Sequence, residues 1–428
     1  METIFALASG RGRAGVAVIR LSGPQSHHIV DILAGAKPAV RLASLRKLRW
    51  HGDVLDEALV LTFAEGASFT GEESAEFQVH GGQAVIEAVF GALRSFPDTR
   101  LAEPGEFTRR ALENGRIELF EVEGLIDLID AETEAQRKQA QRMMRGDLAA
   151  KAADWRSVLL TVTALVEVTI DFVDEEIPVD VWPEVTNRLQ GLADQLKAEL
   201  AGVRMAERIR GGFEVAIFGP PNVGKSSLVN VFVGKDVAIT SDIAGTTRDI
   251  IETRLDLGGL PVVLLDTAGM RLSVDPIEIE GIRRARKRVE EADLKIVVRD
   301  SENADWDPGC AVDIEVWSKA DLGVENARGL TVSAKTGMGL AELERLMAGR
   351  LADMASIAGV VVNERHRMGV AGAESAVRKA IAAIDREEEA ELIAAELLQA
   401  RRFLEALIGK IGVEDVLGEI FGRFCIGK

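Results

Sequence analysis

One glycine-rich turn limits what this chain can fold into more than any other stretch. Residues 219–226 read GPPNVGKS, with a short apolar run (213–218) before them and an apolar, helix-like segment (227–232) after them. A strand, this turn and a helix in that order form a P-loop, whose backbone N–H groups surround phosphates. Because glycine has no Cβ, the backbone N–H groups can approach the phosphates closely. The spacing predicts a phosphate-binding α/β domain, with Lys225 on the β- and γ-phosphates and Ser226 on Mg²⁺.

Four further motifs predict GTP hydrolysis. The apolar run 262–265 ends in DTAG (266–269), where a carboxylate meets Mg²⁺ and a glycine amide meets the γ-phosphate. DIAGTTRD (242–249) lies where a switch segment is expected, with Thr247 as a second Mg²⁺ ligand. SKAD (318–321) supplies a carboxylate, Asp321, which accepts hydrogen bonds from the N1–H and N2–H₂ groups of guanine. SAK (333–335) completes the predicted base pocket.

Two positions depart from ordinary GTPases. The base-reading motif usually begins with Asn, and this chain has Ser318 instead. A shorter side chain is expected to hold the base loops together less well, so we predict weaker nucleotide affinity, with guanine preference kept by Asp321. Met270 stands where many GTPases place a Gln that orients the attacking water. A thioether cannot orient water, so another group must do so.

Residues 1–117 mix short apolar runs with glycine-rich turns, which predicts an α+β domain. Gly10, Gly12 and Gly15 match a dinucleotide-binding pattern, but an alternating, strand-like run follows them where that motif needs a helix. HGG (80–82) is similar to an oxyanion-hole loop, yet the chain has no G-x-S-x-G nucleophile. We interpret this second stretch as a strand-to-helix turn.

The rest of the chain is predicted to be helical on either side of the GTPase domain. Leu119, Val122, Ile126, Ile129 and Thr133 are spaced for one helix face, and the chain is rich in Ala, Leu and Glu again after residue 363. We therefore predict a helical domain from residues 118–210 and 352–428, with the GTPase domain (211–351) inserted between them. The connection 300–311 is short and polar, so one helix of the ordinary GTPase fold is expected to be absent or reduced to a turn.

Composition excludes several other classes of protein. The net charge is −18, which argues against unaided nucleic-acid binding, so an RNA substrate would need a basic partner to present it. Cys310 and Cys425 are the only cysteines, which excludes a disulfide scaffold and indicates a reducing, cytoplasmic setting. No apolar run reaches about 18 residues, so no membrane span is expected. The residues alone leave open whether Cys425 is buried or a reactive thiol.

Taken together, these stretches resemble the MnmE (TrmE) family of tRNA-modification GTPases. The resemblance covers nearly the whole chain and is most specific in the terminal FCIGK combined with a central P-loop. The other matching stretches are 12–23 (GRAGVAVIRLSG), 68–82 (SFTGEESAEFQVHGG), 104–119 (PGEFTRRALENGRIEL) and 170–177 (IDFVDEEI).

The resemblance implies a three-part architecture and a tRNA-modifying role. Residues 1–117 would form a homodimerising domain that binds a tetrahydrofolate derivative, in its 5-formyl or 5,10-methylene form. The helical domain would surround the inserted GTPase. A heterotetramer with the flavoprotein MnmG (GidA) would use tRNA presented by that partner. Together they would place an aminomethyl-type group on C5 of the wobble uridine of certain tRNAs.

The resemblance also assigns residues. It implies folate contacts at Arg20, Glu76, Arg116 and Lys428, and places Cys425 near the folate. It implies that a potassium ion replaces the arginine finger, bound by Asn222, Ser241, Ile243 and Thr246, and that Glu278 acts on the nucleophile through water. Motifs and resemblance together predict GTP binding by Asn222, Val223, Gly224, Lys225, Ser226, Ser227, Ser241, Asp242, Ile243, Ala244, Gly245, Thr246, Thr247, Asp266, Thr267, Ala268, Gly269, Ser318, Lys319, Asp321, Ser333, Ala334 and Lys335.

A second interpretation is a regulatory GTPase, such as a ribosome-assembly factor, with no modifying chemistry. Such factors usually carry a basic RNA-binding module, and this chain is acidic with no KH-like G-x-x-G between helices. A folate transferase with a vestigial GTPase conflicts with intact Lys225, Ser226, Thr247 and Asp266. The enzyme interpretation is therefore the prediction carried forward.

Overall fold

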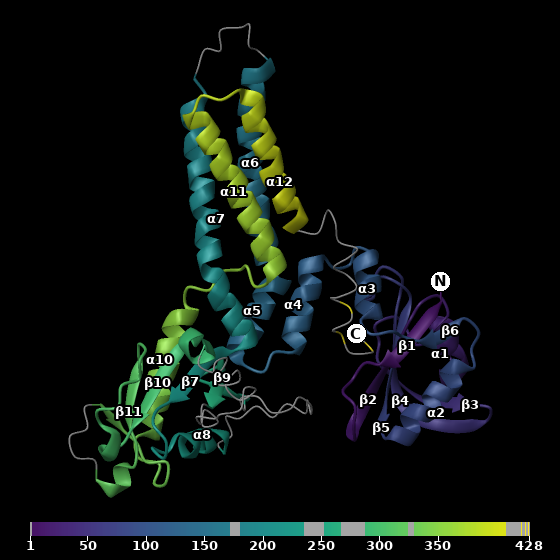
Figure 1. The fold of residues 1–428 in the computed structure, drawn as a ribbon. Helices are drawn as coiled ribbons and strands as arrows, with labels where there is room; N and C mark the ends of the chain where they lie inside the picture. The colour runs from purple at the N-terminus through teal and green to yellow at the C-terminus, as the bar shows by residue number, and fades with distance from the viewer. Residues whose placement is uncertain are drawn as a thin grey trace, which may run out of the picture. The chain divides into compact units, whose positions relative to one another are not determined.

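A computed structural model describes residues 2–171, 180–234, 252–266, 287–323 and 329–407, together with the tail residues 421, 424 and 427. It divides into two compact units (Figure 1). The first comprises Met1–Ile126 with Ile408–Lys428, and the second comprises Asp127–Leu407. Among the described residues, no helix combines the length and apolar character needed to cross a membrane.

The first unit is built on a six-stranded sheet in the order β3-β4-β5-β2-β1-β6. Every neighbouring pair is antiparallel except β1 and β6, which run parallel. The predicted α+β class is therefore confirmed. The elements are β1 (Thr3–Leu7), β2 (Ala14–Ser22), α1 (Ser26–Ala34), β3 (Ser44–Trp50), β4 (Asp53–Phe63), β5 (Ser74–Gly81), α2 (Gln83–Arg94), β6 (Thr99–Leu101), α3 (Glu106–Glu113) and α4 (Leu119–Ile129).

The two faces of this sheet differ because its strands alternate. In β4, Ala58 and Val60 are buried while Leu59 between them is 40% exposed. The buried face packs against α1 and α2 in one hydrophobic cluster. On the other face Leu59 lies opposite Leu45 of β3, which is 58% exposed, and Val16 of β2 is 56% exposed. We call Val16, Leu45 and Leu59 the open face.

The chain terminus and most of α4 belong to the compact unit that holds the first sheet. Phe421 and Phe424 stack with ring centroids 5.9 Å apart and join Val122 and Ile126 of α4 in one cluster. This compact unit extends to Ile126 and includes the tail. The boundary at 117/118 stays a prediction. The apolar side chains of α4 are buried by contact with these two phenylalanines of the tail.

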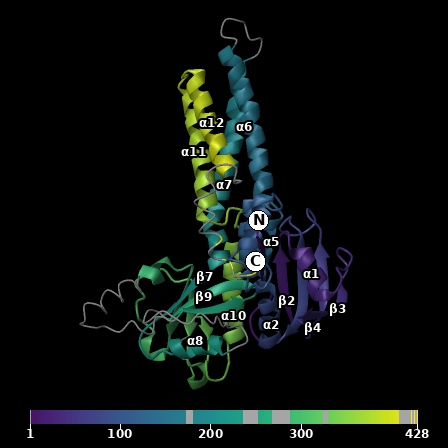
Figure 2. The same cartoon turned by 90° about the vertical axis from the view of Figure 1, so that its right-hand side faces the viewer.

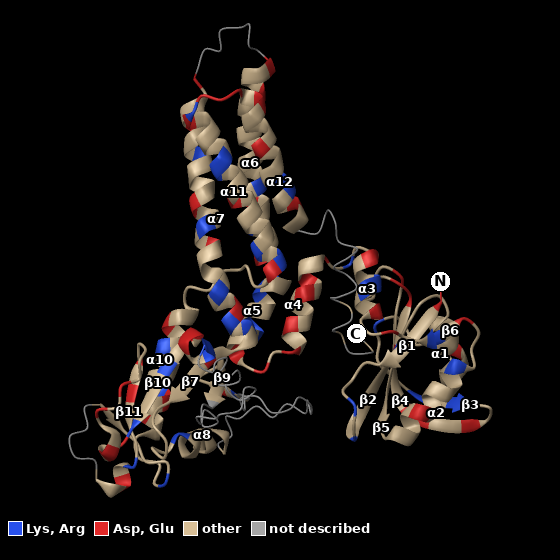
Figure 3. Cartoon of the chain, viewed as in Figure 1, with Lys and Arg blue, Asp and Glu red and all other residues tan. Residues whose placement is uncertain are grey.

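Four long helices form a bundle within the second unit. These are α6 (Asp147–Asp171), α7 (Trp182–Gly211), α11 (Glu364–Asp385) and α12 (Ala390–Leu407). Helix α11 contacts α7 and α12, and α6 contacts the same two helices, which lie side by side in both views (Figures 1 and 2). Segments on both sides of the GTPase domain therefore share one core, as the apolar stripes predicted. Acidic and basic residues both occur along α7 and α11 (Figure 3).

One residue of the predicted stripe has a different role. The spacing placed Thr133 on the apolar face that begins at Leu119, but α4 ends at Ile129. Thr133 instead caps the next helix, α5 (Glu134–Met144), in a capping box with Gln136. The hydroxyl accepts a hydrogen bond from a backbone N–H that has no partner within the helix. Spacing alone did not reveal this break, because a threonine fits both roles.

The GTPase domain holds a second six-stranded sheet, in the order β12-β11-β10-β7-β9-β8. All neighbouring pairs are parallel except β8 and β9. This is the predicted α/β P-loop fold. The elements are β7 (Phe213–Phe218), α8 (Lys225–Val233), β8 (Glu252–Leu257), β9 (Leu260–Asp266), β10 (Leu294–Arg299), η1 (Ser301–Asn303), β11 (Ile314–Trp317), η2 (Ala320–Leu322), β12 (Leu330–Thr331) and α10 (Leu340–Ala355).

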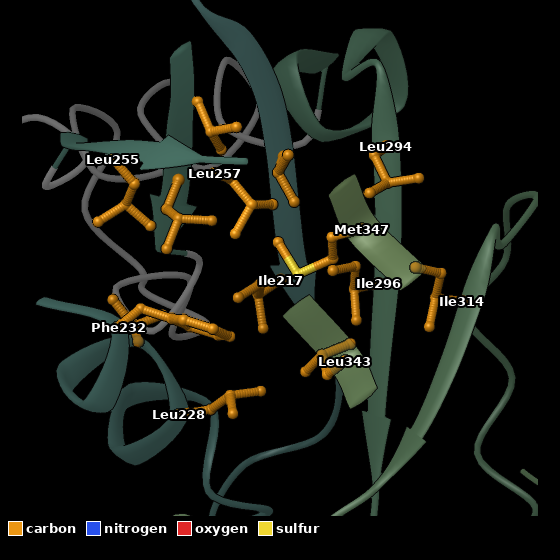
Figure 4. Packing of buried hydrophobic residues seen from close by; sticks show 14 of the residues in the cluster. Ile217, Leu228, Phe232, Leu255, Leu257, Leu294, Ile296, Ile314, Leu343 and Met347 are labelled. Carbon is orange, nitrogen blue, oxygen red and sulfur yellow. The ribbon is translucent and has the colours of Figure 1, made fainter. Parts of the chain in front are cut away.

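Both faces of this second sheet are covered. On one face Ile217 and Ile296 of the strands meet Phe232 of α8 and Met347 of α10 (Figure 4). On the other face Phe218 and Val297 belong to a smaller cluster. Strands buried on both sides read as near-continuous apolar runs, which is why the sequence located them well.

The short connection after β10 contains only a 3₁₀ turn, η1, before β11 begins at Ile314. The prediction that one helix is reduced to a turn is therefore confirmed. Trp306 takes over the covering role: its ring lies 6.5 Å from that of Phe218, and Cys310 and Val312 pack on the same cluster. A single large aromatic side chain thus replaces part of the apolar area of the missing helix.

Candidate functional site

The GTPase site lies at the carboxyl ends of the parallel strands. The P-loop follows β7, the base-reading motif SKAD follows β11, and SAK follows β12. Strand β9 pairs with β7 so that the backbone of Asp266, the first residue of the DTAG motif, lies beside Ile217, one residue before the end of β7. Loops at this edge of an open α/β sheet form its ligand-binding crevice.

Glycine is required at the start of the P-loop by a close approach of two strands. Gly219 has φ +153°, and a Cβ there would lie 2.2 Å from the carbonyl oxygen of Val298. At the other end Gly224, with φ +94°, caps α8, so the helix begins at Lys225, earlier than the predicted Ser227. The first turn of α8 therefore directs its backbone N–H groups toward the loop, as phosphate binding requires.

The P-loop lysine contacts its own loop. Nζ of Lys225 donates to the carbonyl oxygens of Gly219 at 3.0 Å and Pro220 at 2.7 Å. Ser226 and Ser227 are exposed on α8, and Asn222 is exposed with a left-handed backbone, φ 63°. These three polar side chains and the lysine are thus gathered at one helix N-terminus, a donor and acceptor set that fits a Mg²⁺-bound triphosphate.

Ser318 reaches the P-loop despite its short side chain. Its Oγ lies 2.5 Å from the carbonyl oxygen of Val223 and 3.0 Å from that of Arg299. The serine is buried, so these contacts are shielded from water. The physical tie between base loop and P-loop that was expected to weaken is therefore present. The prediction of weaker nucleotide affinity remains a prediction.

Two loops meet at the carboxylate predicted to read guanine. The hydroxyl of Ser333 donates to Oδ1 of Asp321 at 2.7 Å, and the backbone N–H of Ala320 donates to the carbonyl of Val332 at 3.1 Å. The hydrogen bond from Ser333 holds the pKa of Asp321 below its ordinary value. An exposed, ionised carboxylate in this position can accept two hydrogen bonds from the edge of a guanine ring. Ala334 and Lys335 follow on the same loop.

The first unit holds a second constellation around Arg20. Its guanidinium donates to Oε1 of Glu76 on the neighbouring strand, at 3.0 Å from Nε and 2.9 Å from Nη2. Its Cζ also lies 5.9 Å from the ring centroids of both Phe69 and Phe107. Arg116 is exposed, and its side-chain carbons lie over Gly71. Carboxylate, cations and rings together suit a flat heterocycle that carries acidic groups.

The tail reaches the strand beside this constellation. Gly427 has φ +104°, and a Cβ there would lie 2.0 Å from the carbonyl oxygen of Leu7. Leu7 ends β1, whose neighbour Ala6 pairs with Arg20. Only glycine allows the terminal segment to approach this strand end so closely.

The matches to known proteins cover both units. A family model described as the MnmE helical domain matches residues 119–425, and one described as the GTP-binding protein TrmE N-terminus matches residues 3–116. The tRNA modification GTPase MnmE of Cereibacter sphaeroides is 52% identical over 431 residues, with all of both chains covered. That of Ruegeria pomeroyi is 51% identical over 430 residues, again with full coverage of both.

The chain belongs to the MnmE family of tRNA-modification GTPases. Members of this family are GTP hydrolases, in agreement with the P-loop and base loop described above. Among solved structures, the G domain of the T. maritima FeoB iron transporter matches 33% of this chain and 98% of its own length at 24% identity, with a TM-score of 0.24.

Several residues predicted from the MnmE resemblance lie outside the described part of the chain. For Asp266 only the backbone is placed. The others are Ser241, Asp242, Ile243, Ala244, Gly245, Thr246, Thr247, Thr267, Ala268, Gly269, Glu278, Cys425 and Lys428. The Gly10 pattern is followed directly by β2, and HGG joins β5 to α2, so neither is the motif it imitates.

Sequence reasoning missed three residues that touch these MnmE-family sites. Phe69 and Phe107 flank Arg20, and Asp300 binds Lys319 of the base loop at 2.7 Å. Both phenylalanines stand within the stretches that carried the resemblance, SFTGEE and PGEFTRR. Asp300 had a weaker signal: it is an acidic residue directly after an apolar strand, at the end of the sheet where the ligand binds.

Proposed function

We propose that this chain is a potassium-dependent cytoplasmic GTPase that acts with a flavin-dependent partner of the MnmG (GidA) type. Together they form an aminomethyl-type group on C5 of the wobble uridine of certain tRNAs. The one-carbon unit comes from a tetrahydrofolate derivative held by the sheet unit. GTP hydrolysis drives the conformational cycle that permits the modification.

The observation that carries the GTPase part is the joining of P-loop and base loop. Ser318 contacts the carbonyl of Val223, while Asp321 is held by Ser333 with its carboxylate exposed. Lys225 and Ser226 lie at the same loop, so phosphates and base have separate binding groups. Bound Mg²⁺ would neutralise phosphate charge, and the proposed ligands are Ser226 and Thr247.

The folate part rests on Arg20 and Glu76. A pterin ring offers N–H donors along one edge, which suits a carboxylate acceptor, and its glutamate tail suits cations such as Arg116 and Lys428. Phe69 is 39% exposed beside Arg20 and offers a surface for stacking. The approach of Gly427 to Leu7 supports a role for the neighbouring Cys425 near the same ligand.

The open face supports homodimerisation. Val16, Leu45 and Leu59 leave apolar area in water on a sheet that has helices on its opposite face. A second copy of the same domain would bury this area, and a two-fold axis makes such a surface complementary to itself. The net charge of −18 supports the need for a partner to present tRNA.

The family resemblance and the P-loop support the proposed potassium dependence. Asn222 offers an exposed amide oxygen in a left-handed turn, a group that suits a large monovalent cation. Glu278 is the proposed water-activating carboxylate in place of the Gln that Met270 replaces. GTP hydrolysis should be much faster in KCl than in NaCl at equal ionic strength. Equal steady-state rates would rule out the potassium assignment.

The decisive experiment is mass spectrometry of tRNA nucleosides from cells that lack this gene. The wild-type gene should restore the C5-aminomethyl-type wobble uridine, while Lys225→Ala and Cys425→Ser should not. Cys425→Ser protein should still hydrolyse GTP. An unchanged nucleoside profile on deletion would instead support a regulatory or ribosome-assembly GTPase, and the folate and Cys425 roles would fall with it.

A further inference from the structure

A buried carboxylate at the end of β10 joins the shortened connection to the base loop. Asp300 is 3% exposed. Its Oδ1 accepts hydrogen bonds from the backbone N–H of Asn303 at 3.1 Å and from Nδ2 of Asn303 at 2.7 Å. Its Oδ2 accepts from Nζ of Lys319 at 2.7 Å. One side chain therefore fixes both the 3₁₀ turn and a residue of the base-reading motif.

The residue that Asp300 holds is conformationally unusual. Lys319 has φ +59°, a left-handed backbone that side-chain-bearing residues seldom adopt. Its side chain is 39% exposed and long, so it would sample many rotamers if nothing held its ammonium group. Hydrogen bonds fix the backbone on either side: Ser318 N donates to Arg299 O at 2.8 Å, and Ala320 N donates to Val332 O at 3.1 Å. Asp300 fixes the side chain between them.

The serine at position 318 makes this attachment more important than in GTPases with Asn. An Asn amide has two N–H donors, whereas a serine hydroxyl has one proton. Ser318 Oγ lies near two carbonyl oxygens, those of Val223 and Arg299, and can donate to only one of them. The base loop has therefore one side-chain donor fewer. The ion pair between Asp300 and Lys319 gives the base loop another side-chain contact, which joins it to the end of β10.

Two further observations support a fixed, ionised Asp300. Burial alone would raise its pKa, but hydrogen bonds from Lys319 and Asn303 outweigh that effect and hold the pKa below its ordinary value. Arg299 donates to the carbonyl oxygens of Ala304 and Trp306, which ties the connection down beyond the turn. The carboxylate is thus charged at neutral pH and rigidly placed.

We propose that Asp300 is a positioning residue for guanine nucleotide binding, which holds Lys319 in the base loop and so slows nucleotide release. It acts through Lys319 and does not read the base, a task left to Asp321. This role rests on the proposed function, in which residues 318–321 bind guanine. The shortened connection would then serve as a support for the base loop as well as a cover for the sheet.

The test compares Asp300→Asn with Glu302→Gln in the full-length protein. Asparagine keeps an acceptor to cap the turn but loses the charge that holds Lys319. Glu302 is exposed in the same turn, so its substitution removes the same charge without the contact. Stopped-flow release of fluorescent GDP should be about three- to tenfold faster for Asp300→Asn, as a charged hydrogen bond of this kind predicts, and unchanged for Glu302→Gln.

A double-mutant cycle separates positioning from a purely structural role. Lys319→Met keeps the apolar stem and removes the ammonium group. If Asp300 acts through Lys319, Asp300→Asn should add nothing to the release rate in that background. Additive effects would show that Asp300 acts only by capping the turn, and an unchanged rate in the single variant would also overturn the proposal. The preference for GDP over IDP should stay constant throughout, since Asp321 is intact.

A further variant, Asp321→Asn, distinguishes failure of this inference from failure of the base-loop assignment. Xanthine carries a carbonyl where guanine carries its N2 amino group, so Asp321→Asn should shift preference toward xanthosine diphosphate. No shift would refute the base-loop assignment, and the role of Asp300 with it. A shift together with an unchanged GDP release rate in Asp300→Asn would refute only the positioning role.

Discussion

The chain contains two six-stranded sheets, and they differ in how their faces are covered. The GTPase sheet is parallel except at β8, and helices or the Trp306 connection cover both of its faces. The first sheet is antiparallel except at β6, with helices α1 and α2 on one face only. Parallel strands need long crossovers, which bring covering segments with them, whereas antiparallel strands joined by short turns do not.

This difference decides where each sheet can bind something. In the GTPase domain both faces are filled, so binding groups gather at the strand ends, as the contact between Ser318 and Val223 illustrates. In the first unit part of one face is open, and the pair Arg20–Glu76 lies across two strands of it, next to Phe107 of α3. The first sheet is therefore suited to a flat ligand or a second copy, and the second to a ligand held by loops.

The largest effect should come from filling the space where two GTPase strands meet. Gly219→Ala puts a Cβ 2.2 Å from the carbonyl of Val298, so β7 and the P-loop must move. We expect GTP affinity to fall by about 100-fold or more, equivalent to roughly 2.7 kcal/mol. Gly10→Ala, in the pattern that imitates a nucleotide loop, has open space around it and should change nothing. Isothermal titration calorimetry with a non-hydrolysable GTP analogue would compare the two variants. Equal affinities would show that the close approach at Gly219 does not matter for nucleotide binding.

The open face of the first sheet should be sensitive to charge. Leu59→Arg places a cation amid the apolar area that a second copy would cover, so self-association should weaken by about 30-fold, or roughly 2 kcal/mol. Ile32→Arg introduces the same charge on α1, at a residue 45% exposed on the opposite side of the sheet. Analytical ultracentrifugation should show dissociation for the first variant alone. Dissociation by both would mean that the open face is not the specific interface.

The terminal segment offers a smaller test at the same sheet. Gly427→Ala would force a Cβ to within 2.0 Å of Leu7 O, so the tail should withdraw from β1. We expect affinity for 5-formyltetrahydrofolate to fall about tenfold, roughly 1.4 kcal/mol, with GTP hydrolysis unchanged. Gly91→Ala in α2 meets nothing within 4 Å and serves as the control. Unaltered folate binding in Gly427→Ala would separate the tail from the folate site.

The smallest effect concerns stability of the first unit. Glu106 is buried; burial raises its pKa, but hydrogen bonds from Arg100, the Glu103 N–H and Arg110 outweigh that effect and hold the pKa below its ordinary value. Its carboxylate therefore stabilises the fold above about pH 4.5, and this contribution is lost as pH falls through the lowered pKa. Glu106→Gln should cost about 1 kcal/mol at pH 7 and progressively less below pH 4.5.

Calorimetric unfolding of the whole chain between pH 3.5 and 7 would follow this difference. Glu113→Gln removes an exposed carboxylate from the same helix, paired with Arg109 at 3.3 Å, and should lower the transition temperature little at any pH. A constant gap between wild type and Glu106→Gln across this range would show that ionisation of Glu106 does not contribute.

The sequence predicted the strands of the GTPase domain better than those of the first unit, because strands buried on both faces read as continuous apolar runs. Strand β7 spans Phe213–Phe218, as its apolar run indicated, because both of its faces are buried. The reduction of the 300–311 segment to a turn followed from its length and polarity. In the helical region Thr133 was misplaced, because a capping threonine at the right spacing imitates a stripe residue.

Local spacing determined the GTPase motifs of this protein: the P-loop and the Asp321 motif each lie within a few residues, so consecutive positions set their backbone geometry. Tertiary structure alone decided which distant groups meet. Strand register places Arg20 beside Glu76, and the order of the parallel strands places Ser318 beside Val223. Packing of the tail places Gly427 beside Leu7. Because a one-residue slip reverses the faces of a strand, such meetings depend on the whole folded sheet.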